Sequence, residues 1–231
     1  AVATSYSYIG QIYFAQNDYS KALDYFKKSL KLDLSFFGEN HPSVASGYYN
    51  IGYVYFAQGD YSKALEYFEE VLKIRLSVYG ENHSRVASVY NDIGEIYSVQ
   101  GDDFKALDYF KKSLKIVLSV YGENHSQVSS IYDHIGEIYF AQKDYSKALY
   151  YFEESLKIRL SLFGENHPEV ALSYYSIGSL YIIQGDKSKA LNYYEKSLKI
   201  RLSVYGENHP LTKEIMDLIN VANSKVLQSP E

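Results

Sequence analysis

The sequence predicts an all-α solenoid of five helical hairpins followed by a C-terminal capping helix. The tetrapeptide Gly-Glu-Asn-His recurs every 42 residues, starting at Gly38, Gly80, Gly122, Gly164 and Gly206. An Ile-Gly pair keeps the same period, at Ile9-Gly10, Ile51-Gly52, Ile93-Gly94, Ile135-Gly136 and Ile177-Gly178. Such a period is typical of a unit that buries its apolar face only against its neighbours. We expect repeats at 1–41, 42–83, 84–125, 126–167 and 168–209, with a capping helix and tail over 210–231.

The first half of each repeat predicts a helix, which we call helix A. In the second repeat, apolar residues follow one another at three- and four-residue spacing from Val44 to Phe56. Pro42 suits the first helical position, because its φ is fixed and it has no N–H that needs an acceptor. The helix is expected to end near Gln58-Gly59.

A second helix, helix B, follows after a short turn. Asp60 is a suitable N-cap, and the apolar stripe continues from Tyr61 to Leu76, so this helix reaches about Val78. Gly80 then takes the position where a left-handed residue ends many helices. Each repeat is therefore a helical hairpin.

Gly52 and its equivalents lie inside helix A, where glycine costs about 1 kcal/mol relative to alanine. Because this cost recurs in every repeat, we expect close packing against helix B to offset it. The expected small partners on helix B are Ala22, Ala64, Ala106, Ala148 and Ala190.

Composition excludes several classes of protein. The net charge of -5 does not favour a nucleic-acid partner, and without cysteine the fold has neither disulfides nor thiolate metal sites. No apolar run reaches the length of a membrane helix, about 18 residues, and no signal peptide opens the chain. These patterns indicate a cytoplasmic protein without a membrane segment.

The motif Tyr48-x2-Ile51-Gly52-x2-Tyr55, followed by Ala64-x3-Phe68, resembles the tetratricopeptide repeat, with an aromatic residue in place of the usual tryptophan. The 42-residue length and the link Gly-Glu-Asn-His-Pro-x-Val-Ala at 164–171 resemble the kinesin-light-chain type of this repeat. The resemblance covers all five units. It implies a right-handed superhelix whose A helices line the concave side.

The resemblance also implies which side chains line the concave groove. One set of four helix A positions, which includes Phe14 in the first repeat, is aromatic toward the ends and acidic in the middle, without lysine or arginine. We expect the peptide-binding residues to be Tyr49, Tyr53, Phe56, Asn91, Glu95, Asp133, Glu137, Phe140 and Tyr175.

This composition indicates a protein-protein interaction scaffold that binds an extended or helical peptide carrying lysine or arginine with apolar flanks. Acidic partner peptides are disfavoured, because Glu95, Asp133 and Glu137 would meet them without a counter-charge. Other interpretations stay open. These carboxylates are solvated helix surface, or the array is a structural spacer or a self-assembling array without a dedicated peptide ligand, with self-association through its terminal helices.

Tyrosine is unusually frequent, with 27 residues, and most of it is expected in packing columns. These columns are Tyr48, Tyr90, Tyr132 and Tyr174 on helix A, and Tyr25, Tyr67, Tyr109, Tyr151 and Tyr193 on helix B.

Two further sets of residues recur in register. The histidines His41, His83, His125, His167 and His209 are too far apart to share a metal ion, at 8–10 Å or more, and we expect them to hold the turns by hydrogen bonds. His134, beside Asp133, is a lone helix A histidine that we interpret as structural. A convex, salt-bridged face is expected to hold Lys31, Lys73, Lys115, Lys157 and Lys199 with Arg75, Arg159 and Arg201, through pairs such as Glu69–Lys73 and Glu153–Lys157.

The sequence carries no enzyme signature, and we expect neither catalysis nor a cofactor or metal. Pro210 opens the capping helix, whose apolar side is expected to hold Leu211, Ile215, Leu218, Ile219, Ala222 and Val226. Ala1 aligns with Ser43 without the preceding His-Pro, so we expect the array to be a piece of a longer one.

Overall fold

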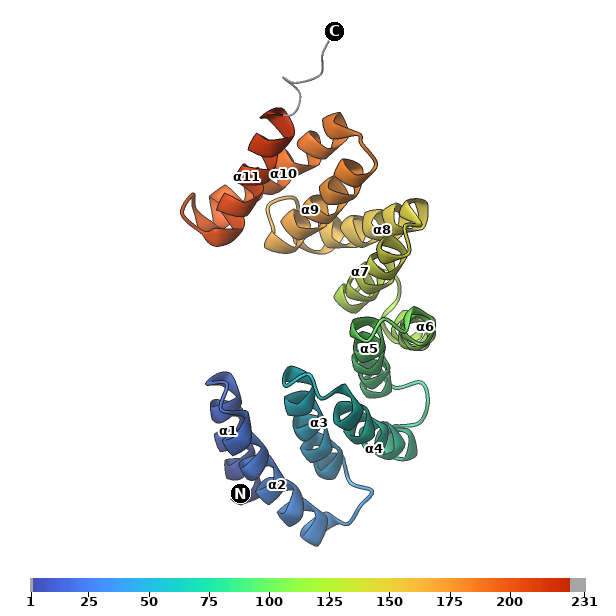
Figure 1. Ribbon diagram of the computed structural model, residues 1–231. Helices are drawn as coiled ribbons and strands as arrows, with labels where there is room; N and C mark the ends of the chain where they lie inside the picture. Colours follow the sequence, from blue (N-terminus) through green and yellow to red (C-terminus); the bar gives the residue numbers. More distant parts are fainter. Residues whose placement is uncertain (1, 225–231) are drawn as a thin grey trace. The chain divides into compact units, whose positions relative to one another are not determined.

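The computed structural model describes residues 2–224, and over this range the chain consists of α-helices without strands, which confirms the all-α repeat fold (Figure 1). The helices are α1 (Val2–Ala15), α2 (Tyr19–Phe37), α3 (Pro42–Ala57), α4 (Tyr61–Tyr79), α5 (Ser84–Val99), α6 (Asp103–Tyr121), α7 (Ser126–Ala141), α8 (Tyr145–Phe163), α9 (Pro168–Ile183), α10 (Lys187–Tyr205) and α11 (Pro210–Ser224). Odd-numbered helices up to α9 are the A helices, and even-numbered ones are the B helices.

Hydrogen bonds from side chains fix where each helix begins. The Nδ1 atom of the linker histidine accepts from the backbone N–H two residues later, at 3.1–3.3 Å, in all five links. The same ring stacks on the aromatic residue four positions earlier, with centroids 4.1–4.6 Å apart. Helix B begins with an aspartate that accepts from the N–H three residues later, as expected for Asp60. The hydrogen-bonding role of the histidines is therefore confirmed.

The glycine after helix B differs from expectation in its backbone geometry. Gly38, Gly80, Gly164 and Gly206 have φ of 74–80°, but ψ of 170–178° instead of the left-handed helical value. This combination is open essentially only to glycine, because a Cβ would collide with the backbone. The link therefore leaves helix B extended and leads directly into the next histidine cap.

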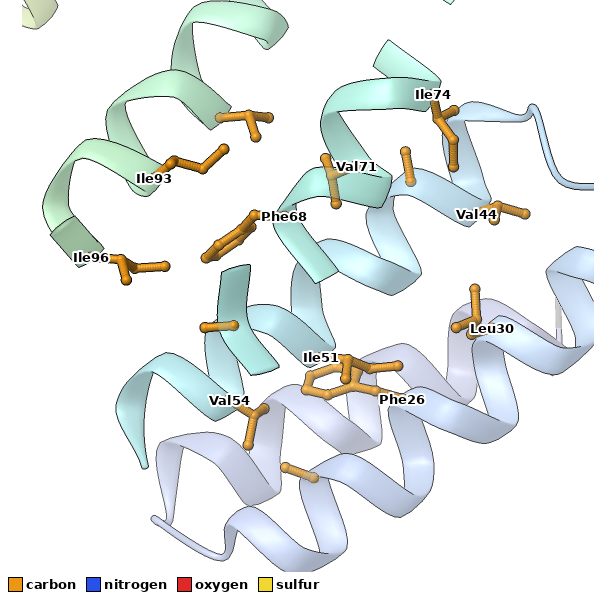
Figure 2. Close-up of a cluster of buried hydrophobic side chains, with 14 residues drawn as sticks. Phe26, Leu30, Val44, Ile51, Val54, Phe68, Val71, Ile74, Ile93 and Ile96 are labelled. Atoms are coloured by element: carbon orange, nitrogen blue, oxygen red, sulfur yellow. The ribbon is translucent and has the colours of Figure 1, made fainter. Parts of the chain in front are cut away.

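The chain forms two compact units, Ala1–Val120 and Tyr121–Glu231, each with its own core. In the first unit, Phe26 and Phe68 pack with apolar residues of the A helices, including Ile51 and Ile93 (Figure 2). Figure 2 shows the Phe68 ring of α4 pointing toward Ile93 and Ile96 of α5. In this unit, α2 and α4 thus each pack on their own A helix and on the next one.

The core of the second unit follows the same plan. Phe152 of α8 packs in a cluster with Val170, Ile177 and Leu180 of α9. In the capping helix α11, Ile215 and Ala222 are buried, whereas Leu211 is exposed. Val226 lies outside the described residues.

Close packing at the helix A glycine is confirmed, but the partner atom differs from the expectation. A Cβ built on Gly10, Gly94, Gly136 or Gly178 would lie 2.7–2.8 Å from a ring atom of the helix B aromatic residue. The alanine on helix B contributes mainly its backbone oxygen, as at Gly178, where Ala190 O would be 3.3 Å away. An aromatic ring therefore fills the space that the missing side chain leaves.

The tyrosine columns are also where the periodicity places them. Each helix B tyrosine of the columns lies between two tyrosines of its own helix A, one stacked at 5.5–5.7 Å and one tilted at 5.6–6.0 Å between centroids. Since the hairpin uses these rings for packing, they are structural.

The glycine contact predicts a difference between two substitutions of the same kind. We expect Gly94→Ala to lower the free energy of unfolding by about 1–2 kcal/mol, because its Cβ would meet the buried Phe110 ring at 2.8 Å. Gly52→Ala should change it by less than about 0.5 kcal/mol, because the nearest atom is 3.1 Å away and alanine favours the helix. Urea denaturation of both variants checks this, and an equal loss would contradict the ring contact.

Candidate functional site

The A helices of the first unit carry an aromatic patch formed by Phe14, Tyr53 and Phe56. Tyr53 lies 5.6 Å from Phe14 of α1 and 6.2 Å from Phe56, measured between ring centroids. Tyr53 is 43% exposed, so its neighbours cover it only in part. Tyr49 stacks on Tyr53 at 6.2 Å and also contacts the core ring of Phe68. The structure thus brings together three of the expected groove residues, and Phe14 with them.

Arg75 of α4 reaches the junction between α3 and α5 in the same unit. Its Nη1 donates to the backbone oxygen of Arg85 at 2.7 Å and to Ser88 Oγ at 2.9 Å. The guanidinium lies over the Tyr49 ring, 5.2 Å from its centroid. The expectation of a convex Arg75 is therefore wrong, because this side chain crosses between repeats toward helix A.

Asp92 of α5 is a buried carboxyl group that the sequence analysis did not select. Burial raises its pKa to about 7, and the nearby charge of Glu95 adds to the shift, whereas a hydrogen bond from Tyr49 and the charge of Arg75 oppose it. Its Oδ2 atom is buried without a hydrogen-bond partner among the described residues. The interior beside Tyr49 therefore holds a carboxyl group that changes protonation near neutral pH.

The two expected groove residues on α5 interact with each other. Asn91 Nδ2 donates to Glu95 Oε1 at 2.7 Å, and both side chains are half-buried. On α5, Glu95 takes the position that Tyr53 has on α3, one repeat earlier. The carboxylate therefore belongs to the same set of helix A positions as the aromatic patch.

Asp133, the central acidic residue of the expected site, is bound by an arginine in the second unit. Arg159 Nη2 lies 2.7 Å from Asp133 Oδ2 and 3.0 Å from Glu169 Oε2, and Nη1 donates to Ser173 Oγ at 2.8 Å. Arg159 is 4% exposed. Burial raises the pKa of Asp133, and the charge of Arg159 opposes that shift. The expectation that Asp133 has no counter-charge is therefore wrong.

Arg201 makes the equivalent junction between α9 and α11. Its Nη1 donates to the backbone oxygen of Leu211 at 2.6 Å and lies 3.5 Å from Glu214 Oε2. The guanidinium is 4.9 Å from the centroid of Tyr175, whose hydroxyl donates to Glu214 Oε1 at 3.0 Å. Tyr175 is thus part of an internal network, and Arg201, at 4% exposure, is not on a convex face.

The sequence contained a signal for these buried arginines. Arg75 follows Phe68 and Val71 at the spacing of the apolar stripe, and the equivalent residue in the third repeat is Val117. Val117 is 1% exposed. A position that holds valine in one repeat and arginine in others faces the interior, so the apolar stripe of helix B extends through it.

The remaining expected residues of the second unit lie on α7. Glu137 has a 69% exposed side chain, and its Oε2 is 4.0 Å from His134 Nδ1. Phe140 is half-buried and lies 5.9 Å from Tyr145, ring to ring. Glu137 is therefore the most exposed carboxylate of the expected set.

The lysines of the expected salt-bridged face are exposed, but their partners differ from the expected ones. Lys73 pairs with Glu70 at 3.6 Å, and Lys157 with Glu154 at 3.5 Å, both one residue closer than expected. Among residues 2–224, no group of three or more histidines and carboxylates is placed to hold a metal ion. None of the described helices combines the length and apolarity that crossing a membrane requires.

Removing Arg159 should destabilise the fold, because its partner Asp133 is buried. We expect Arg159→Val to lower the free energy of unfolding by about 2–4 kcal/mol, because Asp133 would be left buried without its counter-charge. Adding Asp133→Asn recreates the Asn91 and Val117 pair of the third repeat and should recover most of the loss. Urea denaturation measures both, with the exposed Lys157→Val as control. A loss that Asp133→Asn leaves unchanged would show that charge is not the cause.

Asp92 should make stability depend on pH. The folded-state pKa is raised from 3.8 to about 7, so folding favours the protonated form, and this group's contribution is lost as pH rises from about 4 to 7. Asp92→Asn should therefore be more stable than the original chain at pH 8 by up to about 4 kcal/mol, and little different at pH 4. Thermal unfolding of both proteins across this range tests the sign. A constant difference would contradict it.

Comparison with known proteins agrees with this geometry. The tetratricopeptide repeat family model matches residues 1–77, 43–119, 85–161 and 127–203. The fold is similar to BtubC (BKLC) from P. vanneervenii, at 24% identity and a TM-score of 0.77, covering 89% of this chain and 81% of that one.

Two further solved structures share the fold at lower identity. A kinesin light chain-like protein from Podospora anserina with nearly identical TPR-like repeats is 16% identical, with a TM-score of 0.73 over 87% of this chain and 96% of that one. A Rap protein complexed with competence and sporulation factor is 18% identical, with a TM-score of 0.68 over 94% of this chain and 64% of that one. No protein of curated function matches the chain. From its repeats, its helical hairpins and the family match, the chain belongs to the tetratricopeptide repeat family.

Proposed function

We propose that the chain is a protein-interaction scaffold whose A-helix surface binds a peptide segment of a partner, carrying lysine or arginine between apolar side chains. The observation that carries this proposal is the aromatic patch of Phe14, Tyr53 and Phe56. Tyr53 remains 43% exposed although it lies among three other aromatic rings. Aromatic rings held by neighbouring helices are rigid contacts that cost a binding partner little ordering.

The negative charge of the A helices supports a basic partner, but fewer residues contribute to it than the sequence alone suggested. Asp133 and Tyr175 interact with arginines of the scaffold. The proposed contacts are therefore Glu95 with the aromatic patch in the first unit, and Glu137 by itself in the second unit. These carboxylates favour a cationic side chain by electrostatic complementarity, which also raises the association rate at low salt. The Rap protein complexed with competence and sporulation factor supports the proposal by analogy of fold.

A peptide array tests the proposal, followed by fluorescence anisotropy on the selected peptides. We expect peptides with lysine or arginine and aromatic flanks, and a loss of affinity of about tenfold or more in Glu95→Lys with Glu137→Lys. Tyr53→Ser should cause a similar loss by removing the exposed ring.

The matched control is Glu66→Lys with Glu153→Lys, which changes the net charge equally on exposed positions of the B helices. If the control variant weakens binding as much as Glu95→Lys with Glu137→Lys, the effect is one of overall charge and the proposed surface is wrong. If no peptide is selected, the scaffold does not bind peptides of this class.

Self-association is the second candidate function, because α1 exposes apolar side chains. Tyr8 is 63% and Ile12 57% exposed, whereas Val54, the equivalent of Ile12 in α3, is fully buried. A second copy could cover this face. Sedimentation equilibrium decides between the two: a mass that rises with concentration, and falls back in Ile12→Lys, supports assembly.

A further inference from the structure

Three arginines of the B helices occupy the same place in different repeats. Arg75 and Arg159 each bridge the helix A of their own repeat and the beginning of the next A helix, and Arg201 likewise bridges α9 and the beginning of the capping helix α11. Their contacts fall at corresponding positions. The ring or carboxylate that each guanidinium contacts belongs to Tyr49, Asp133 or Tyr175, and these residues are separated by multiples of the 42-residue period. The repeat geometry therefore creates a place for a guanidinium group between successive A helices.

In the first repeat this place lacks its arginine. The equivalent residue is Asp33, which lines a hollow of about 180 Å³ between α1, α2 and α3. The walls include Ser7, Ser43 and Gly47, which correspond to Asp133, Glu169 and Ser173, the three residues that bind Arg159. Smaller side chains at these positions leave open the space that a guanidinium fills in the fourth repeat.

The hollow is polar and larger than a bound water requires, which is about 10–15 Å³. Thr4, Ser46 and Asn50 line it, and Asn50 Nδ2 donates to Ser7 Oγ at 3.4 Å across the junction. Burial raises the pKa of Asp33 and the charge of His41 lowers it, so a bound cation would further stabilise its ionised form.

We propose that this hollow binds the guanidinium group of an arginine that a partner peptide supplies, with Asp33 as its counter-charge. The partner's arginine takes the place that the scaffold's own arginines take in other repeats. Helix B here supplies the carboxylate, Asp33, where in the fourth repeat it supplies the arginine. Guanidinium fits better than ammonium, since its planar fork donates to a carboxylate and to neighbouring oxygens together. The inference rests on the proposed peptide binding and names where its basic residue docks.

Amide NMR with blocked amino acids tests the pocket directly. N-acetyl-arginine amide should shift the Ser7, Gly47 and Asn50 signals with saturation, N-acetyl-lysine amide more weakly, and N-acetyl-alanine amide not at all. Asp33→Asn should weaken arginine binding about tenfold or more. Asp24→Asn, which removes the same charge from an exposed position of α2, should leave it unchanged.

A second variant fills the pocket from within. Asp33→Arg with Ser7→Asp recreates the Arg159 and Asp133 pair, so it should abolish probe binding while the circular dichroism spectrum stays unchanged. The proposal is overturned if arginine gives no saturable shift, or if Asp33→Asn and Asp24→Asn bind it equally. If peptides bind the aromatic patch with an affinity that Asp33→Asn does not change, this inference is wrong and the proposed scaffold function stands. If the hollow binds arginine but the chain selects no peptide, the arginine pocket stands and the proposed scaffold function fails.

Discussion

The contact between the helix A glycine and the helix B aromatic ring sets the spacing within the hairpins. At four of the five glycines a Cβ would lie within 2.8 Å of the ring, so only glycine lets the two helices come this close. The B helix can then pack on its own A helix and on the next one, as Phe68 does with Ile93. Because a repeat has no other core, the burial that stabilises each unit depends on this approach.

Local capping makes the same geometry repeat. Every link ends helix B at a glycine with positive φ and begins the next helix A at a histidine whose Nδ1 accepts a backbone N–H. The histidine ring also stacks on the last aromatic residue of helix B, so one side chain joins both helix ends. These interactions lie within a few residues of each other in sequence, which is why the links are uniform although the surfaces vary.

Arginines at the junctions decide how much of the acidic surface is available to a partner. Arg159 neutralises Asp133, and Arg201 bridges Tyr175 and Glu214, so charge that looked like a ligand site serves the scaffold itself. Only where the arginine is replaced, by Val117 or by Asp33, does a junction differ in character. Variation at a single helix B position thus converts an internal ion-pair site into apolar core or into a polar hollow.

The sequence alone determined the helices, their caps, the tyrosine columns and the position of the close-contact glycine. All of these depend on spacing within one repeat, and a 42-residue period repeats the evidence five times. The aromatic patch was predictable in part, because Tyr53 and Phe56 lie on one face of the same helix, α3, with Tyr49 one turn earlier.

Only the tertiary structure decided which of those residues are available. Arginine is long enough to cross from helix B to two A helices, and its partners Asp133, Glu169 and Ser173 are 26, 10 and 14 residues away, at spacings unrelated to the helix period. The burial of Asp92 likewise comes from packing between successive repeats. The pair of Arg159 with Asp133 lies within the fourth repeat, whereas its contacts with Glu169 and Ser173 join that repeat to the next one and form only in the folded stack.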